Sequence, residues 1–348
     1  MLRRTFIQAG GALAVGASFA SAMARAEGAG WTRYALTTRV DLAKPGAPAD
    51  LWLPLAEDRA GWQRAGQPRF QTTGQARVVR DPRYGAAMLH VNWGQGGGPR
   101  TVELTQAVST RDRTADGAAL TPAEQRFWTA PTASLPTGGI VGGTARRITA
   151  GHAEPPAKAR AIYDWVVDNT FRDAAVRGCG TGGVENMLRT GYLGGKCADI
   201  NSLFVALCRA CGLPARDVYG VRLGPSAFVK VLGTSGPDVT RAQHCRAEVW
   251  LPGQGWLPVD PADVRKVVLE AKLAPDSLEV RAQRARLFGS WEMNWAAYNS
   301  AGDIALPGAS RPPAEHFLMY PLAMTPEGEL DQLDPARFRY SLTSRTLI

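Results

Sequence analysis

One segment constrains the fold of this 348-residue chain more than any other, residues 191–224, GYLGGKCADINSLFVALCRACGLPARDVYGVRLG. Its apolar residues recur at i, i+3, i+4, i+7, i+8 and i+11, as Ile200, Leu203, Phe204, Leu207, Cys208 and Cys211. This spacing predicts a helix that begins near Cys197 and buries one face. Gly212 and Pro214 follow the last apolar position and are expected to end it.

Cys197 lies at the predicted start of this helix, directly after Gly194, Gly195 and Lys196. Unpaired N–H groups and the helix dipole stabilise a thiolate there, lowering a thiol pKa from about 8.5. The same N–H groups could hold the oxyanion of a tetrahedral intermediate. A buried structural cysteine is the alternative, but Cys197 falls off the apolar stripe. We therefore interpret it as a nucleophile.

A β-hairpin is predicted over AQHCRAEVWLPGQGWLPVDPADV, residues 242–264. Residues from His244 to Leu251 alternate in polarity, PGQG supplies the turn, and Trp256 to Val259 form the returning strand, followed by Asp260. His244 and Asp260 lie near the open ends of the two strands, where a carboxylate can orient an imidazole and set its tautomer. The two residues are the predicted acid–base partners of Cys197.

The two segments together, GGKCADINSLFVALCRACGLPAR and HCRAEVWLPGQGWLPVDP, resemble the transglutaminase-like superfamily over about residues 155–264. The resemblance implies a papain-like core with Cys197 as nucleophile, His244 as general base and acid, and Asp260 as the orienting carboxylate. Cys245 and Arg246 stand where the family often has a small residue and an aromatic one, so the acceptor side of the site is left open.

Four further residues are predicted to contact substrate on weaker grounds: Gly195, Tyr192, Asp199 and Arg246. Arg246 and Glu248 flank the catalytic strand and are expected to pair with each other. We expect no cofactor and no metal, and no run of carboxylates suggests a calcium loop.

The three other histidines, His90, His152 and His316, lack partner patterns, and His90 is expected on a solvated strand face. The aromatic stretch of residues 287–300 is interpreted as a structural wrap rather than a substrate-stacking wall.

Five cysteines are present, an odd number. If Cys197 is the nucleophile, Cys179, Cys208, Cys211 and Cys245 could form two disulfides, one or none, and the sequence does not choose among them. Cys208 and Cys211 form a CxxC, but at the C-terminal end of a helix, where the dipole disfavours a redox thiolate. Buried thiols or a disulfide are favoured there over zinc.

The first 26 residues, MLRRTFIQAGGALAVGASFASAMARA, have the features of a twin-arginine export signal with a small-residue cleavage site, which would start the mature chain near Glu27. A membrane anchor is the alternative, but the run is short and diluted by glycine and alanine. We expect a periplasmic or secreted protein with no membrane span after signal removal.

The formal charge is +9, and Arg3, Arg4 and Arg25 carry three of these charges, leaving +6 after the signal. The excess is dispersed, without a basic run interleaved with aromatic residues, so nucleic acid is not an expected partner.

The expected organisation is an α+β chain. It comprises the signal at 1–26, an antiparallel β-sandwich-like module at 27–110, a linker at 111–143, the transglutaminase-like domain at 144–270, and an extension packing on that core at 271–348. The alternation from His316 onward predicts that the tail adds strands to a sheet.

The predicted activity is acyl transfer through a cysteine acyl-enzyme on peptide or isopeptide amides of a protein or peptide, such as a cell-wall peptide, with hydrolysis favoured. An amine-accepting, cross-linking transglutaminase is one alternative. A non-catalytic scaffold or binding module of the same fold is another.

Overall fold

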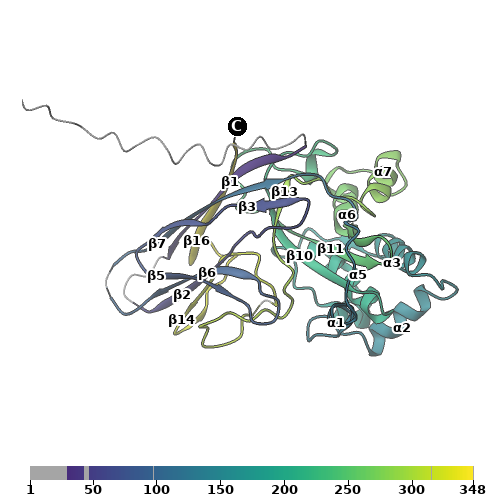
Figure 1. Ribbon diagram of the computed structural model, residues 1–348, viewed down its shortest axis with the longest axis horizontal. Coiled ribbons are helices and arrows are strands. Elements are labelled where there is room, and N and C mark those ends of the chain that lie inside the picture. Colours follow the sequence, from purple (N-terminus) through teal and green to yellow (C-terminus); the bar gives the residue numbers. More distant parts are fainter. Residues whose placement is uncertain (1–29, 43–46, 97, 315, 348) are drawn as a thin grey trace, which may run out of the picture.

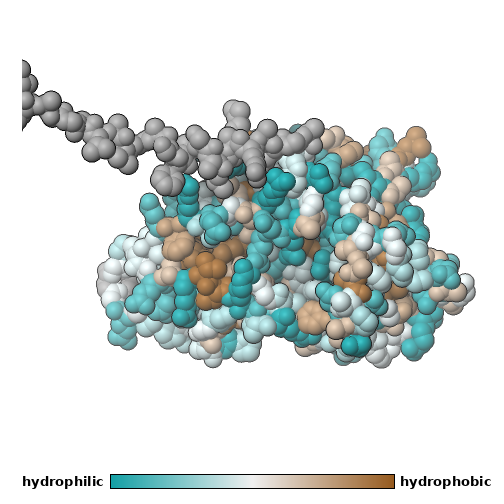
Figure 2. Space-filling model, viewed as in Figure 1, coloured by the Kyte–Doolittle hydropathy of each residue, from teal (hydrophilic) through white to brown (hydrophobic). Residues whose placement is uncertain are grey.

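The computed structural model describes residues 30–42, 47–96, 98–314 and 316–347. The predicted export signal lies outside these residues. Across the part of the chain that the structure describes, no helix combines the length and the apolar character that a membrane crossing requires. Figure 1 shows two lobes, a β lobe of two sheets and a helical lobe built around a third sheet. Hydrophilic side chains cover most of the face shown in Figure 2, with one larger apolar patch over the β lobe.

The β lobe consists of two antiparallel five-stranded sheets. The first has the order β16-β1-β7-β3, with β4 also pairing with β7: β1 (Thr32–Leu42), β3 (Gln63–Ala65), β4 (Arg69–Thr72), β7 (Arg100–Thr110) and β16 (Phe338–Leu347). The second has the order β15-β14-β2-β6-β5: β2 (Ala49–Pro54), β5 (Gln75–Arg80), β6 (Ala87–Trp93), β14 (Leu322–Thr325) and β15 (Gly328–Glu329).

The inner faces of these two sheets share one apolar core. Val40, Leu42 and Val102 from the first sheet pack with Leu51 and Leu89 from the second, and all five are less than 5% exposed. Burying such a side chain contributes about 1.5–3 kcal/mol. The period-two alternation therefore produces the predicted β-sandwich, because it gives each sheet one apolar face.

The C-terminal segment builds into both sheets of the β lobe. Strand β16 pairs with β1 along its whole length, with Val40 opposite Tyr340, and β14 pairs with β2. The prediction that the tail adds strands to a sheet is confirmed. These strands complete the β lobe, whereas the sequence interpretation placed residues 271–348 on the catalytic core; of that segment, β13 (Trp295–Asn299) joins the sheet of the helical lobe.

The expected linker at 111–143 contains helical structure. Helix α1 (Pro122–Thr129) begins with a capping box in which Thr121 and Glu124 bond each other's backbone, and Pro122 takes the first helical position. These are standard helix-start features, and here they outweigh the loop-like composition. Helix α2 (Gly139–Ile148) starts within the same stretch.

The helical lobe surrounds a sheet of order β12-β11-β10-β13: β10 (Ala215–Arg222), β11 (Gln243–Leu251), β12 (Gly255–Val259) and β13. A short parallel pair joins β8 (Phe171–Arg172) to β9 (Gly194–Gly195). The remaining helices are α3 (Pro155–Asn169), α4 (Val184–Thr190), α5 (Cys197–Ala210), η1 (Lys230–Leu232), α6 (Pro261–Glu270) and α7 (Leu278–Arg286).

Helix α5 forms the centre of the helical lobe (Figure 1). Ile200, Leu203, Phe204 and Leu207 are wholly buried, and α5 packs against α2 and α3 as well as β10 and β11. It ends before Gly212, whose φ of +77° suits glycine. The predicted helix, its start at Cys197 and its end are confirmed.

A separate apolar cluster joins the two lobes. Tyr34 and Val108 of the β lobe and Leu342 of β16 pack with Val221 of β10 and Tyr298 of β13. This shared core fixes the position of the β lobe relative to the third sheet, because close-packed side chains resist displacement.

Candidate active site

Cys197 is the first residue of α5, and its side chain is only 3% exposed. The glycines of β9 bring the chain into this helix through a crowded turn. A Cβ on Gly195 would lie 2.5 Å from the Cβ of Asp199. Asp199 is itself held by backbone N–H groups of Thr181, Gly182 and Lys196 at 2.9–3.0 Å. The position of Cys197 therefore depends on a glycine at 195.

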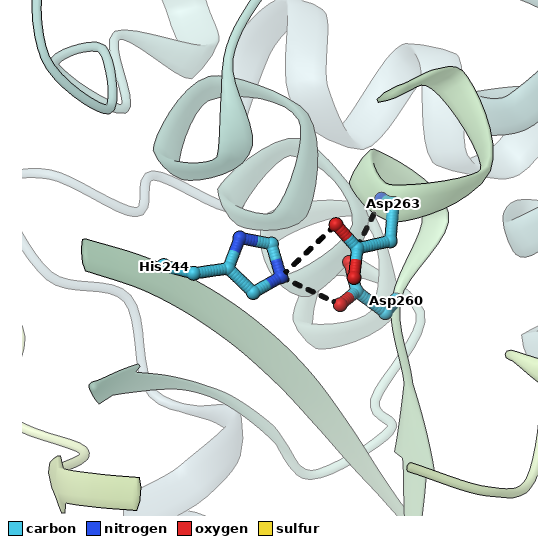
Figure 3. A group of neighbouring side chains, drawn as sticks. All are labelled: His244, Asp260 and Asp263. Atoms are coloured by element: carbon cyan, nitrogen blue, oxygen red, sulfur yellow. Dashed lines mark hydrogen bonds and ion pairs between the residues drawn. The ribbon is translucent and has the colours of Figure 1, made fainter. Parts of the chain in front are cut away.

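His244 and Asp260 meet as the hairpin predicts. Nε2 of His244, in β11, lies 2.8 Å from Oδ2 of Asp260 at the end of β12. The other oxygen of Asp260 accepts the backbone N–H of Asp263 at 3.0 Å and so caps α6. Figure 3 shows Nε2 facing the carboxylates and Nδ1 on the opposite side of the ring. Asp260 thus fixes the ring orientation and leaves Nδ1 for another partner.

Cys197 lies close enough to the His244 ring for the imidazole to affect the pKa of its thiol. Hydrogen bonds to Cys179, Cys245 and His244, together with the charge on His244, lower the pKa of Cys197 well below its usual value despite its burial. Burial alone would lower the pKa of His244, but the carboxylates of Asp263 and Asp260 raise it from 6.5 to about 9. The two shifts together favour a thiolate on Cys197 beside an imidazolium on His244.

A second carboxylate, Asp263, lies against the same imidazole nitrogen at 3.4 Å (Figure 3). Arg222 donates to Asp263 at 2.6 Å, and both side chains are buried. Burial opposes ionisation of Asp263, yet Arg222 and His244 hold its pKa well below the usual range. His244 is therefore charged between two carboxylates, one of which is neutralised by Arg222.

Arg246 lies behind this group rather than pairing with Glu248 as predicted. Its Nε is 3.5 Å from Oδ2 of Asp260, and its guanidinium stacks between the rings of Trp291 and Trp295. Since both tryptophans are at most 1% exposed, the structural interpretation of this aromatic stretch is confirmed.

Glu248 pairs instead with Arg113 and, at 2.6 Å, with Arg216. The predicted Arg246–Glu248 pair is wrong because each side chain finds a closer partner from another element.

Three thiols gather at the start of α5. Both Cys179 and Cys245 form side-chain hydrogen bonds with Cys197, and burial together with these bonds raises their own pKa values. The Cys179 thiol also donates to the Gln243 carbonyl at 3.3 Å. All five cysteines lie in the described part of the chain and are free thiols, so the open question of pairing resolves without a disulfide.

A cleft with a volume of about 1190 Å³ opens onto Cys197 and His244. The helical lobe and the loop that precedes β11 supply part of its wall. The C-terminal segment supplies another part through Tyr320, Leu333, Phe338 and Tyr340. The tail that completes the β lobe therefore also borders the reactive thiol.

The four weaker candidates lie elsewhere, since none of them lines this cleft. Gly195 and Asp199 support the turn before α5 as described above. Tyr192 is 54% exposed and donates to Asp173 at 2.9 Å, and Arg246 is enclosed by tryptophans.

His244, Asp260 and Asp263 are also a group whose ligand atoms lie within 4.8 Å of one another. Their oxygens already accept bonds from Arg222, His244 and the α6 backbone. Arg246 adds a further positive charge at 3.5 Å. The guanidinium groups of Arg222 and Arg246 already neutralise the two carboxylates. These side chains are therefore better suited to hold a charged imidazole than a metal cation.

Of the other histidines, His90 differs from its prediction. It is 5% exposed, bonds Asp50 at 2.7 Å and stacks on Trp52, because the strand that contains it is covered on both faces. His152 is exposed, and His316 packs against Tyr219 and Phe317. Cys208 is buried, and Cys211 contacts Thr149 at 3.5 Å.

Sequence reasoning missed Asp263, Arg222, Asn201 and Cys179. Asn201 lies four residues after Cys197, and Asp263 three residues after Asp260. Helical spacing could have placed each beside its neighbour. Nothing in the sequence links Arg222 or Cys179 to the site.

Comparisons with known proteins agree with this architecture. The family model of the transglutaminase-like superfamily matches residues 142–261. An uncharacterized protein of Haemophilus influenzae is 35% identical over 339 residues, covering 90% of this chain and 91% of that protein.

Among solved structures, a candidate cysteine protease from Cytophaga hutchinsonii has a TM-score of 0.50 at 14% identity, covering 90% of this chain and 98% of its own. The periplasmic domain of TgpA from Pseudomonas aeruginosa is 18% identical, covering 69% and 92%, with a TM-score of 0.36. The α+β, papain-like fold class is confirmed, and the chain belongs to the transglutaminase-like superfamily.

Proposed function

We propose that this protein is a thiol hydrolase that cleaves peptide or isopeptide amides through an acyl-enzyme on Cys197. The observation that carries the proposal is the buried His244–Asp260 hydrogen bond of 2.8 Å in a large cleft that His244 lines together with Cys197, the first residue of α5. A structural cysteine has no need of an oriented imidazole with a raised pKa.

The reaction begins when the Cys197 thiolate attacks the amide carbonyl carbon and forms a tetrahedral oxyanion. The N–H of Ala198 already donates to the Cys179 carbonyl at 2.9 Å. We therefore infer that the backbone N–H of Cys197 itself, at the positive end of α5, donates the hydrogen bond that stabilises the oxyanion.

Collapse of this intermediate breaks the carbon–nitrogen bond, and Nδ1 of the His244 imidazolium gives its proton to the leaving amine. Neutral His244 then takes a proton from water, whose oxygen attacks the thioester. The carboxylic acid is released, and the thiolate–imidazolium pair is restored. Asp260 keeps the ring oriented through both proton transfers.

Water is the favoured acceptor because the cleft is wide and partly polar, so solvent reaches the acyl-enzyme. An amine acceptor would give cross-linking instead. Together with the proposed export signal, this chemistry suits a periplasmic or secreted enzyme that acts on protein or peptide amides, such as those of cell-wall peptides.

The test uses purified residues 27–348 with a peptide library in water enriched in oxygen-18. Hydrolysis places the heavy oxygen in the new carboxylate, whereas added labelled amine appears in the product only if the enzyme is a transferase. Cys197→Ala is expected to abolish both reactions, and Cys211→Ala serves as the matched cysteine control. If the wild type and Cys197→Ala give the same products, the protein is a non-catalytic scaffold.

A further inference from the structure

The cleft beside Cys197 is lined mainly by cationic side chains. Six basic residues contribute to its wall, against one acidic residue, Asp238; the basic ones are Arg172, Arg177, Lys196, Arg222, Arg241 and Lys266. Dispersed positive charge along the sequence thus becomes concentrated at the site.

Several of these cations pair with acidic residues that do not line the cleft themselves. Arg222 pairs with Asp263 at 2.6 Å, and Arg177 pairs with Asp331 at 2.9 Å. Arg172 and Lys266 share a single carboxylate, that of Glu270, at 2.8 and 3.6 Å. Burial, followed by the charge of Arg222, lowers the pKa of Lys266, as expected where positive charges crowd together.

Lys196 and Arg241 form no ion pair with any residue that the structure describes. Asp238, the acid in the wall, accepts the Thr240 N–H at 2.9 Å. A backbone hydrogen bond and, to a smaller extent, the charge of Lys196 lower the pKa of Asp173, so that carboxylate is counted too. Six cations then face five carboxylates, those of Asp173, Asp238, Asp263, Glu270 and Asp331, which leaves a positive excess.

The position of this excess is informative. Lys196 directly precedes the nucleophile, and Arg241 lies three residues before His244, so both belong to the segments that carry the reacting groups. The apolar bodies of Tyr320, Leu333 and Phe338 line the same cleft. Low-dielectric walls strengthen the attraction between such cations and an incoming anion.

We propose that the substrate of this cleft is an acidic peptide, with carboxylates close to the scissile amide that pair with Lys196 and Arg241. This inference rests on the proposed hydrolase function and adds the substrate class to it. A carboxylate of either kind, on a side chain or at a chain end, meets the requirement.

The test measures binding rather than turnover, with the Cys197→Ala protein and fluorescent pentapeptides. One peptide contains two glutamates, and its counterpart has glutamines at both positions; each is made with a free and with an amidated C-terminus. We expect the glutamate peptide to bind about tenfold more tightly at low salt, with the difference shrinking as salt screens the charges.

Arg241→Gln is expected to weaken binding of the glutamate peptide about fivefold and to leave binding of the glutamine peptide unchanged. Arg281→Gln is the matched control, because Arg281 is an exposed arginine in α7 outside the cleft. Loss of binding on amidation alone would assign the recognised carboxylate to the chain end.

Equal binding of both peptides, unaffected by Arg241→Gln, would overturn the acidic-substrate proposal even if the wild type hydrolyses amides. Conversely, selective binding of glutamate peptides without any Cys197-dependent hydrolysis would retain anion recognition and reject the hydrolase.

Discussion

Asn201 donates a hydrogen bond from Nδ2 to Oδ1 of Asp260 at 3.3 Å, joining the helix of the nucleophile to the carboxylate that orients the imidazole. The same amide donates to the Cys245 carbonyl at 2.9 Å and accepts the Ala262 N–H at 3.2 Å. Because Asn201 lies one helical turn after Cys197, it fixes α5 against both β11 and α6. One buried amide therefore connects all three elements of the candidate site.

Asn201→Ala should lower the free energy of unfolding by about 1–3 kcal/mol, since it leaves the Cys245 carbonyl and the Ala262 N–H without partners. Urea denaturation measures this change. Asn186→Ala, at an exposed asparagine of α4, should shift it by less than about 0.5 kcal/mol. Equal effects of the two variants would contradict the structural role of Asn201.

Asp260→Asn should reduce kcat by about 10²- to 10⁴-fold, because an amide cannot stabilise the imidazolium as the carboxylate does. Steady-state hydrolysis of a peptide that the wild type cleaves provides the measurement. The helix cap survives in this variant, since asparagine also caps helices, so the protein should stay folded. The control is Asp164→Asn in α3, which should retain wild-type kcat because Asp164 pairs with Arg284 and does not line the cleft.

The pH profile of alkylation should separate Cys197 from an ordinary thiol. Because its pKa is lowered, labelling of Cys197 by iodoacetamide should slow much less between pH 8 and 6 than labelling of a free cysteine, which slows about 100-fold. Peptide mapping by mass spectrometry isolates Cys197 from the other four cysteines.

The rate of hydrolysis should depend on pH at the alkaline end, where His244 loses its proton. The His244 imidazolium is fully present below its pKa of about 9 and is lost as pH rises through that value. Turnover should therefore fall above pH 9, since the leaving amine no longer receives its proton. An unchanged rate above that pH would show that His244 is not the general acid.

Asp263→Asn should destabilise the fold by about 3–5 kcal/mol, because Arg222 would remain buried without its acidic partner. Thermal or urea unfolding tests this cost. Glu103→Gln removes the acid from an exposed pair with Arg39 and should cost at most about 1 kcal/mol.

Gly195→Ala should destabilise the protein by about 1–3 kcal/mol and slow alkylation of Cys197, since the new Cβ would overlap Asp199. Asp199 cannot easily move, because three backbone N–H groups hold it. Gly143→Ala in α2 is the matched control, where the added Cβ has room and should stabilise the helix by about 0.5–1 kcal/mol.

The sequence by itself determined the local elements of the site. The helical stripe after Cys197 and the alternation from His244 to Asp260 are contiguous patterns, and each fixes which way its side chains point within a few residues. The β-sandwich followed from alternation in the same way.

Only the tertiary structure decided which distant residues complete the site. Arg222 meets Asp263 across 41 residues, and β16 meets β1 across some 300, so that Tyr340 and Cys197 border one cleft. Pairing of Arg246 with Asp260 rather than Glu248 was decided likewise. Charges and strand edges choose partners by proximity in the folded chain, and a periodicity read along the sequence carries no information about that proximity.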